Sequence, residues 1–352
     1  MKNNIKYWWY LMINIIYRLV SPKLFEEVYG EINDLENEVI VCLIYLLICN
    51  ADQRYYQGSR VPEVLNNKLP MALIHEGVGK VIKDGTGHFN VGDNVVMIPN
   101  IPIENDKVIA ENYLTSSKFR SSGYDGFMED YVSLKPDRLI KIPNNCNLNV
   151  LAFTELVTVS YQAILRFKKH SNKNKNIIGI WGDGNLGYIT SLLLKIIFPN
   201  SKIIVFGVND EKLEMFSFVD KTYKINEIPK DLTIDHAFEA VGGLNSQSAI
   251  SQIIDLINPE GTISILGVSE YPIQINTRMI LEKGLILFGT TRSGRKDFLG
   301  AINLFKENPK ILEYLENIIN ETIEINNLND ITKAFDKDFN SNFGKTVLVW
   351  NK

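Results

Sequence analysis

The sequence predicts an α/β protein with two domains, one rich in β-strands and one built on a doubly wound parallel sheet. The chain has 352 residues, which is too long for one ordinary hydrophobic core. Residues 13–150 mix short β-rich runs with Gly and Pro, a pattern typical of a folded-over β domain. From residue 177 strand-like runs alternate with helical stretches, which predicts a parallel sheet with helices on both faces.

The β-rich part begins with INIIYRLV at 13–20, and Met12 directly precedes it. We therefore expect residues 1–11 to be an N-terminal extension that the core does not need. Asn14 and Arg18 interrupt the apolar stretch at this start, which is shorter than the ~20 residues of a spanning helix, so we expect no membrane anchor or signal peptide. The other runs predicted as strands are 39–49, 77–82, 91–99, 127–134 and 138–143.

Residues 151–169 are apolar at helical spacing and end in basic residues, which predicts a helix linking the domains. The runs that follow predict a helix at 185–198 and strands at 177–182, 202–207, 235–243, 261–268 and 284–291. After residue 296 two amphipathic helical stretches and a strand at 344–350 remain, and we expect this strand to return to the first domain. The predicted domains are therefore 12–155 completed by 296–352, and 156–295.

Composition excludes several classes of function. The chain is 45% hydrophobic and 22% charged, which is typical of a globular protein. Its formal net charge of −4 gives no general electrostatic attraction to nucleic acid or to an anionic membrane. Its three cysteines are an odd number without a close pair, which favours a reducing compartment, and we expect the cytoplasm. Small molecules are the expected partners.

A glycine loop, Gly182-Asp-Gly-Asn-Leu-Gly187, follows an apolar strand and opens a helix, which is the context of a dinucleotide-binding fingerprint. Gly182 permits a tight turn, Gly184 lets a pyrophosphate approach the backbone, and Gly187 allows close packing of helix on strand. The alternative is a purely structural strand-to-helix turn.

The next strand ends at Gly207, where a site that prefers NAD usually places an acid for the ribose hydroxyl, and Lys212 follows five residues later. A missing acid and a nearby cation favour NADPH. Asp210 and Glu211 leave a preference for NAD open as the alternative, because an acidic residue would take the ribose-binding position if that position lay three residues further along the chain.

A metal site is predicted upstream of this loop. Cys49 closes an apolar strand, and His75 and Glu76 are adjacent in a chain that holds only four His. A Cys, His and carboxylate set can hold zinc with one position open for a substrate oxygen. Asp52 is placed to accept the other ring N–H of His75. Each residue alone is more often structural, and it is their joint occurrence upstream of a nucleotide loop that predicts a catalytic set.

Six motifs together resemble the zinc-type medium-chain alcohol and polyol dehydrogenases, over residues 13–352: CNAD (49–52), HEGVGKV (75–81), VGDNVV (91–96), GYDGFMEDYV (123–132), TELVTVSYQA (154–163) and GDGNLG (182–187). More narrowly, ADQRYYQGSR (51–60), LPMALIHEGVG (69–79), ENYLTSSKFRSSGYDGFMEDYV (111–132), IWGDGNLGYIT (180–190) and LILFGTTRSGRKDF (285–298) resemble the ribulose-5-phosphate reductases. The resemblance implies a GroES-like catalytic domain and a Rossmann domain with the active site between them.

The resemblance also implies roles for particular residues. Glu155 matches a zinc-site position beside Cys49, His75 and Glu76, and whether both glutamates bind zinc together is left open. Positions matching the cofactor site, besides the three loop glycines, are Asn185, Leu186, Gly207, Asn209, Lys212, Val241, Val268 and Thr290.

The sequence departs from the family at two places. The family's proton relay places a hydroxyl residue and a His where this chain has Ala51 and Arg54. Residues 97–122 lack the four cysteines of the family's structural zinc lobe, so one catalytic zinc and no structural zinc is expected.

The resemblance to the ribulose-5-phosphate reductases implies NADPH-dependent reduction of D-ribulose 5-phosphate to D-ribitol 5-phosphate, which would feed CDP-ribitol for teichoic acid or capsule. Arginine recognises phosphate with two hydrogen bonds. Arg54 is therefore the first candidate for the substrate phosphate, with Tyr55, Arg120 and Arg292 also assigned to substrate. The alternatives are a polyol or alcohol dehydrogenase of an unphosphorylated substrate and a non-catalytic NADPH-binding scaffold. A homodimer through the apolar strand 285–291 and a cytidylyltransferase partner are the expected assemblies.

Overall fold

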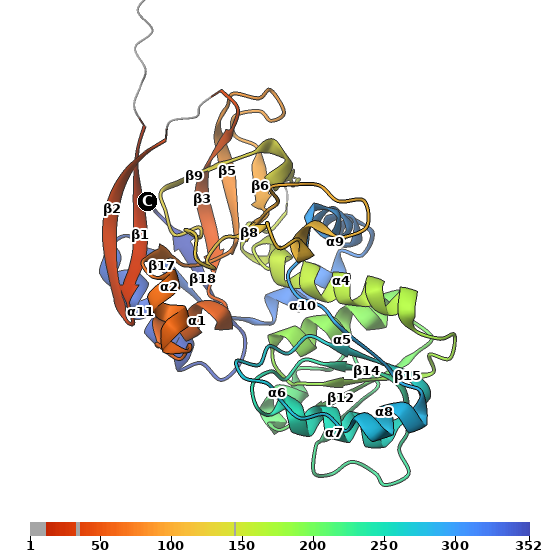
Figure 1. Ribbon diagram of the computed structural model, residues 1–352. Coiled ribbons are helices and arrows are strands. Elements are labelled where there is room, and N and C mark those ends of the chain that lie inside the picture. Colours follow the sequence, from red (N-terminus) through yellow and green to blue (C-terminus); the bar gives the residue numbers. More distant parts are fainter. Residues whose placement is uncertain (1–11, 33–35, 144–145) are drawn as a thin grey trace, which may run out of the picture.

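The computed structural model describes residues 12–32, 36–143 and 146–352, so the predicted extension 1–11 lies outside the described residues. Figure 1 shows two lobes: a β lobe, which holds β1–β10 together with β17 and β18, and a parallel-sheet lobe, which holds β11–β16. None of the helices in the described part of the chain has both the length and the apolar character that crossing a bilayer requires.

The β lobe is built on a sheet with the order β10-β6-β5-β3-β18-β17, on which β9 also pairs with β3, and a smaller sheet with the order β2-β1-β4. Its strands are β1 (Met12–Ser21), β2 (Leu24–Ile32), β3 (Val39–Leu47), β4 (Met71–Ala72), β5 (Glu76–Asp84), β6 (Asn94–Met97), β7 (Asn100–Ile101), β8 (Lys118–Phe119), β9 (Tyr131–Leu134), β10 (Leu139–Lys141), β17 (Ile319–Ile325) and β18 (Lys345–Trp350). Although β18 is nearly 300 residues from β3 in the sequence, it pairs with β3 antiparallel, Leu348 opposite Leu46.

Two short helices, α1 (Asn50–Tyr56) and α2 (Pro62–Lys68), follow β3 where the sequence pattern predicted no helix. The cause is local: the Cys49 backbone N–H donates to the Asp52 carboxylate, which caps the first turn of α1. Pro62 at the first position of α2 supplies a backbone already set for a helix. Single 3₁₀ turns span Glu111–Tyr113 and Pro136–Arg138.

The parallel-sheet lobe has six strands, all parallel, in the order β13-β12-β11-β14-β15-β16. They are β11 (Ile177–Trp181), β12 (Lys202–Gly207), β13 (Lys221–Lys224), β14 (Ile234–Glu239), β15 (Ile257–Ile265) and β16 (Ile286–Gly289). Its helices are α5 (Asn185–Ile197), α6 (Asp210–Glu214), α7 (Ser246–Leu256) and α8 (Thr277–Lys283).

Both faces of this sheet are buried. Ile203 and Val205 join a core with α5, whereas Ile204 and Phe206 join a second core with α7 on the other face. The alternation along β12 is therefore the strand period of two, and because both faces are buried, residues 203–206 of this strand are all apolar.

Helices α3 (Leu148–Leu151) and α4 (Thr154–His170) connect the lobes, and α4 lies between them in Figure 1. Beyond β16 the chain forms α9 (Arg295–Glu307), α10 (Lys310–Glu316) and α11 (Leu328–Phe339). With β17 this makes three helices and a strand before β18, where the sequence pattern predicted two helical stretches. Gln162 on α4 donates to Asp297 on α9 at 3.0 Å, which joins the two helices.

Candidate active site

Cys49, His75 and Glu76 lie together in the β lobe, and one potential ligand atom from each lies within 4.8 Å of the other two. We call these three residues the ligand trio. Cys49 stands between β3 and α1, and Glu76 begins β5 directly after His75. His75 and Glu76 are buried, and Oε2 of Glu76 has no hydrogen-bond partner among the described residues. A thiol, an imidazole and a carboxylate with an unpartnered buried oxygen fit a divalent ion such as zinc.

Asp52 holds the ligand trio in place. Its fully buried carboxylate accepts hydrogen bonds from the Cys49 and Ile74 backbone N–H groups at 3.2 and 3.0 Å, and from Ser121 Oγ at 2.6 Å. Burial raises the pKa of Asp52, but the charge of His75 and these hydrogen bonds outweigh it and hold the pKa below its ordinary value. His75 Nδ1 lies 3.7 Å from Asp52 Oδ1, too far for a hydrogen bond, so the predicted contact is electrostatic in this structure.

Backbone strain is concentrated around the site. Ile74, Ser121 and Arg292 have φ angles of 67°, 59° and 57°, in the left-handed region that residues other than Gly rarely adopt. Asp52 binds the first two of these residues, which explains how the fold sustains the strain. Such strain clusters at functional sites because the surrounding contacts are needed to hold it.

Lys345, which the sequence analysis did not single out, enters the site from the first position of β18. Its Nζ lies 2.5 Å from Glu76 Oε1, and both side chains are buried. Burial lowers the pKa of Lys345, but the charge of Glu76 outweighs it, and the pKa is raised. The pair therefore consists of a charged ammonium group and a charged carboxylate, and the carboxylate belongs to the ligand trio.

Glu155 lies in the first turn of α4 and does not join the ligand trio, although the sequence placed it among the metal ligands. Burial raises its pKa to about 7; the charge of His75 opposes this and that of Glu76 adds to it. No hydrogen bond or ion pair to its carboxylate is found among the described residues. Glu155 therefore faces the trio as a nearby carboxyl group and not as a fourth ligand in this arrangement.

The glycine loop has the geometry that an anion requires. A Cβ on Gly187 would lie 1.9 Å from the Gly182 carbonyl oxygen, so the helix can pack on the strand only without one. A Cβ on Gly184 would meet nothing within 4 Å, and Gly184 is the N-cap of the 13-residue helix α5. Open space against backbone N–H groups at a helix N-terminus is a cradle for a pyrophosphate. Nδ2 of Asn185 donates to the Gly344 carbonyl, and Leu186 lies beside it in the first turn of α5.

Gly207 ends β12, so the last residue of the strand itself carries no acidic side chain. Asp183 binds the turn instead, because its Oδ2 accepts from the Val208 and Asn209 backbone N–H groups at 2.7 and 2.9 Å. Asn209 caps α6 by accepting from the Lys212 N–H, while Asp210 is paired with Lys224 at 2.7 Å. The side chain of Lys212 forms no ion pair with the described residues.

Exposed apolar side chains follow the strands at the carboxyl edge of the parallel sheet: Val208, Val241 and Val268 come after β12, β14 and β15. The buried Glu239 carboxylate ties two of these ends together by accepting from the Val241 and Gly267 backbone N–H groups. Thr290, which follows β16, is buried, and its Oγ1 has no partner among the described residues. An apolar edge beside an anion cradle suits the flat rings of a dinucleotide.

Of the predicted substrate residues, Arg54, Tyr55 and Arg292 lie near the ligand trio. The pKa values of Arg54 and Arg292 are lowered, first of all by burial, with the charges of Cys49 and Glu155 respectively opposing that shift. The ring of Phe119 lies between His75 and Arg292, 5.3 Å from the imidazole and 4.6 Å from the guanidinium. Tyr55 is buried, and its hydroxyl forms no hydrogen bond with the described residues.

The assignment of Arg120 to substrate stays a prediction, and the contacts of its side chain weigh against it. Its guanidinium pairs with Glu129 at 3.3 Å and donates to the Asp125, Gly126 and Ser133 carbonyls. These contacts engage both terminal nitrogens of Arg120 inside the β lobe, so they are not free to donate a pair of hydrogen bonds to a phosphate. Ser121, the next residue, is the one that reaches the site, through Asp52.

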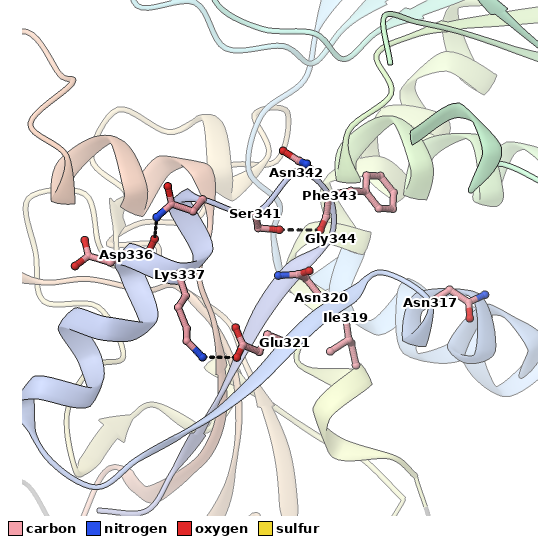
Figure 2. A pocket seen from close by; sticks show the side chains of 11 residues that line it. Asn317, Ile319, Asn320, Glu321, Asp336, Lys337, Ser341, Asn342, Phe343 and Gly344 are labelled. Carbon is pink, nitrogen blue, oxygen red and sulfur yellow. Dashed lines mark hydrogen bonds and ion pairs between the residues drawn. The ribbon is translucent and has the colours of Figure 1, made fainter. Parts of the chain in front are cut away.

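A hollow of about 740 Å³ lies beside β17, α11 and the segment before β18, and Figure 2 shows the side chains that line it. Four asparagines line it, and Lys337 pairs with Glu321 at 2.5 Å on its wall. It contains none of the predicted site residues. Gly344, which accepts from Asn185 of the glycine loop, is the point where this hollow approaches the cofactor region.

The alcohol dehydrogenase GroES-like domain matches residues 35–144, and the zinc-binding dehydrogenase domain matches residues 186–307. The chain belongs to the zinc-binding dehydrogenase family. The predicted fold class, a GroES-like domain with a Rossmann domain, and the predicted enzyme class, a zinc-type oxidoreductase, are thereby confirmed.

Relatives in two genera cover nearly the whole chain. Ribulose-5-phosphate reductase 1 of Staphylococcus aureus is 56% identical over 339 residues, 96% of this chain and 99% of the relative. Ribulose-5-phosphate reductase of Bacillus spizizenii is 52% identical over the same shares. The crystal structure of S. aureus TarJ in complex with NADPH superposes with a TM-score of 0.87 at 50% identity, covering 97% of this chain and all of that one. The predicted resemblance to ribulose-5-phosphate reductases is confirmed.

Proposed function

We propose that the protein reduces D-ribulose 5-phosphate to D-ribitol 5-phosphate with NADPH and zinc, and that the product feeds CDP-ribitol for teichoic acid or capsule. The observation that carries this proposal is the position of Arg54 and Arg292 beside the ligand trio, because it puts cations next to a site for a carbonyl oxygen. The relatives named as ribulose-5-phosphate reductases and the neighbour that binds NADPH support it.

Each part of the site has a task in this reaction. Cys49, His75 and Glu76 would hold a zinc ion, which would supply a Lewis acid for the C2 carbonyl oxygen, and the glycine loop would hold NADPH, which would supply the hydride. Asp52 fixes the segments that carry the three ligands. Arg54 and Arg292 hold the phosphate end of the sugar, and the apolar edge with Val241 and Val268 aligns the cofactor. Glu155 on α4 would be available as a further ligand for a bound ion.

The absence of an acid at Gly207 supports the preference for NADPH. A 2′-phosphate at this strand end meets no carboxylate from the strand itself, and Lys212 in α6 forms no ion pair with the described residues. Asp210, the residue that would restore an acid, is already paired with Lys224.

The test is a panel of initial rates with ribulose 5-phosphate, xylulose 5-phosphate and unphosphorylated ribulose, each with NADPH and NADH, beside the zinc content of the purified protein. We expect the highest kcat/KM for ribulose 5-phosphate with NADPH and about one zinc per chain. Equal rates for ribulose and its phosphate would favour an unphosphorylated polyol as substrate. A protein that turns over without zinc would refute the mechanism.

The assembly and location are further parts of the proposal. We infer a homodimer through β16, because this strand is at the edge of its sheet and Ile286 on it is exposed. The cytidylyltransferase that consumes ribitol 5-phosphate is a candidate partner, and three free cysteines favour the cytoplasm. We infer domain boundaries at 12–155 with 296–352 and at 156–295; residue 155 lies in the first turn of α4, a helix that both domains share.

A further inference from the structure

A cluster of cations surrounds Tyr55, and one of them, Arg60, was not among the predicted substrate residues. The Arg60 guanidinium lies over the Tyr55 ring, 4.6 Å from its centroid, and Lys68 Nζ lies 5.9 Å from the same centroid. Arg54 precedes Tyr55 in α1, and Arg292 is close enough for the two to interact electrostatically. Arg60 and Lys68 therefore lie against the Tyr55 ring, and Arg54 and Arg292 interact with Tyr55 electrostatically.

One carboxylate from the other lobe neutralises part of this cluster. Oε2 of Glu270 lies 3.1 Å from Arg60 Nη1 and 3.4 Å from Arg54 Nη1. Oε1 of Glu270 also accepts from the Val61 backbone N–H at 3.4 Å. The Glu270 carboxylate is thus bound by two guanidinium groups and one backbone N–H. Proteins bind phosphate groups with the same kinds of donor.

Glu270 is held in this position by its own lobe. It lies in the segment 266–276 between β15 and α8. Next to it, Ser269 Oγ donates to the Gly243 carbonyl at 2.6 Å, and the Gly243 N–H donates to Val268 at 3.0 Å. The segment is thus fixed to the carboxyl edge of the parallel sheet, and the side chain of Glu270 alone extends to the arginines.

The cluster keeps positive charge to spare. Arg60 Nε is buried without a hydrogen-bond partner among the described residues. Among the described residues Glu270 forms ion pairs only with Arg54 and Arg60, and Arg292 and Lys68, the other two cations near Tyr55, form none. The strained φ of 57° at Arg292 is a second sign that this arrangement serves a ligand and not stability alone.

We propose that Arg60 and Arg54 form the phosphate subsite of the sugar substrate, and that the Glu270 carboxylate fills this subsite until the substrate phosphate displaces it. The proposal rests on the proposed function, which supplies a phosphorylated substrate. Because phosphate carries about two negative charges where Glu270 carries one, it competes successfully for the two guanidinium groups.

The first test is a calorimetric titration of the zinc-loaded enzyme with inorganic phosphate, in saturating NADPH so that the cofactor's own phosphate sites are occupied. We expect Glu270→Gln to bind phosphate about three- to ten-fold more tightly than the wild type, because it removes the internal competitor. We expect Arg60→Met to weaken binding about ten- to a hundred-fold, the effect of losing a charge-assisted contact. Arg60→Lys keeps the positive charge but loses the paired N–H donors of the guanidinium group. Its affinity for phosphate should therefore lie between those of the wild type and Arg60→Met.

Glu282→Gln is the matched control, because Glu282 also pairs with an arginine, Arg278, in the parallel-sheet lobe, at 2.8 Å and on the surface. It should leave the affinity for phosphate unchanged. Equal phosphate affinity in the wild type, Glu270→Gln and Arg60→Met would overturn the proposal.

The second test is kinetic. Arg60→Met should lower the ratio of kcat/KM for ribulose 5-phosphate to that for ribulose by about ten-fold or more. If Arg60→Met instead raises the KM for NADPH and leaves that ratio unchanged, the arginines serve the cofactor's phosphate and the proposal is overturned. If the wild type fails to reduce ribulose 5-phosphate while phosphate binds as predicted, the proposed function fails and the subsite stands.

Discussion

Replacing Lys345 by Met tests the charge balance behind the ligand trio. Lys345 is the one ion-pair partner of Glu76 among the described residues, and the side chains are 4% and 0% exposed. Met keeps most of the alkyl stem, so the substitution removes the charge and leaves little cavity. In the metal-free protein Glu76 is then a buried carboxylate without a cation, next to Glu155 and Asp52.

Breaking a buried pair by removing one partner costs about 3–5 kcal/mol. At an unfolding entropy of about 2.1 cal/mol/K per residue, a chain of 352 residues that unfolds in one transition loses about 4–7 °C in Tm. Zinc bound to the trio supplies the missing positive charge, so the loss should be smaller in the zinc-loaded protein. Differential scanning calorimetry of the zinc-free and zinc-loaded forms measures both values.

The matched control is Lys337→Met, because Lys337 and Glu321 also lie 2.5 Å apart but are 58% and 38% exposed. An exposed pair contributes about 0–1 kcal/mol, so its Tm should fall by about 1 °C or less. The double variant Lys345→Met/Glu76→Gln should recover most of the lost stability, since no unpaired charge remains. A metal-free Lys345→Met protein as stable as Lys337→Met would refute the reasoning.

Four further outcomes are expected. Cys49→Ala should abolish turnover and zinc content while circular dichroism shows a folded chain; a zinc-free variant that retains activity would contradict the metal assignment. Arg120→Met should lower stability to urea, because it removes the cation paired with Glu129, and should leave the KM for ribulose 5-phosphate unchanged; a raised KM would support the predicted role of Arg120 in binding substrate. Burial raises the pKa of Glu129 from 4.5 to about 7, so between these values the folded chain holds more protons than the unfolded chain; stability should fall as pH rises through this window, by up to about 1.4 kcal/mol per unit, and the fall should vanish in Glu129→Gln. Ile286→Lys should convert the inferred dimer to monomers in analytical ultracentrifugation, and a monomeric wild type would exclude that interface.

The features that the sequence predicted are those encoded within a short stretch of chain. The alternation of strands and helices after residue 177, and the glycine loop with its open Gly184, depend on local spacing. The adjacency of His75 and Glu76, and the position of Cys49 at the end of a strand, were likewise visible. Strands β2, β13 and β17 and helices α1 and α2 were not predicted, because they are short or carry many polar residues.

The features that the sequence did not predict depend on contacts between distant residues. Lys345 reaches Glu76 only because β18 pairs with β3, although a lysine at the start of the apolar run KTVLVW was a signal that could have been weighed. Arg120 lies in a motif of the family resemblance, and nothing in that motif shows that Glu129 and three carbonyls engage it. Glu270 reaches the arginines across 210 residues of sequence.

The pairing of β18 with β3 also sets an order of events during synthesis. The ribosome releases β3, Cys49, His75 and Glu76 early, and all of the parallel-sheet lobe follows before β18 emerges. At a synthesis rate of about 5–20 residues per second, β18 is completed on the order of 15–60 s after β3. During that interval β9 can pair with Val39–Cys42 of β3, but Tyr45–Leu47 lack a partner strand on the β18 side, and Glu76 lacks its lysine. A nascent chain of this protein is therefore open to strand-pairing errors until β18 arrives, and this is the stage at which a chaperone would act on it.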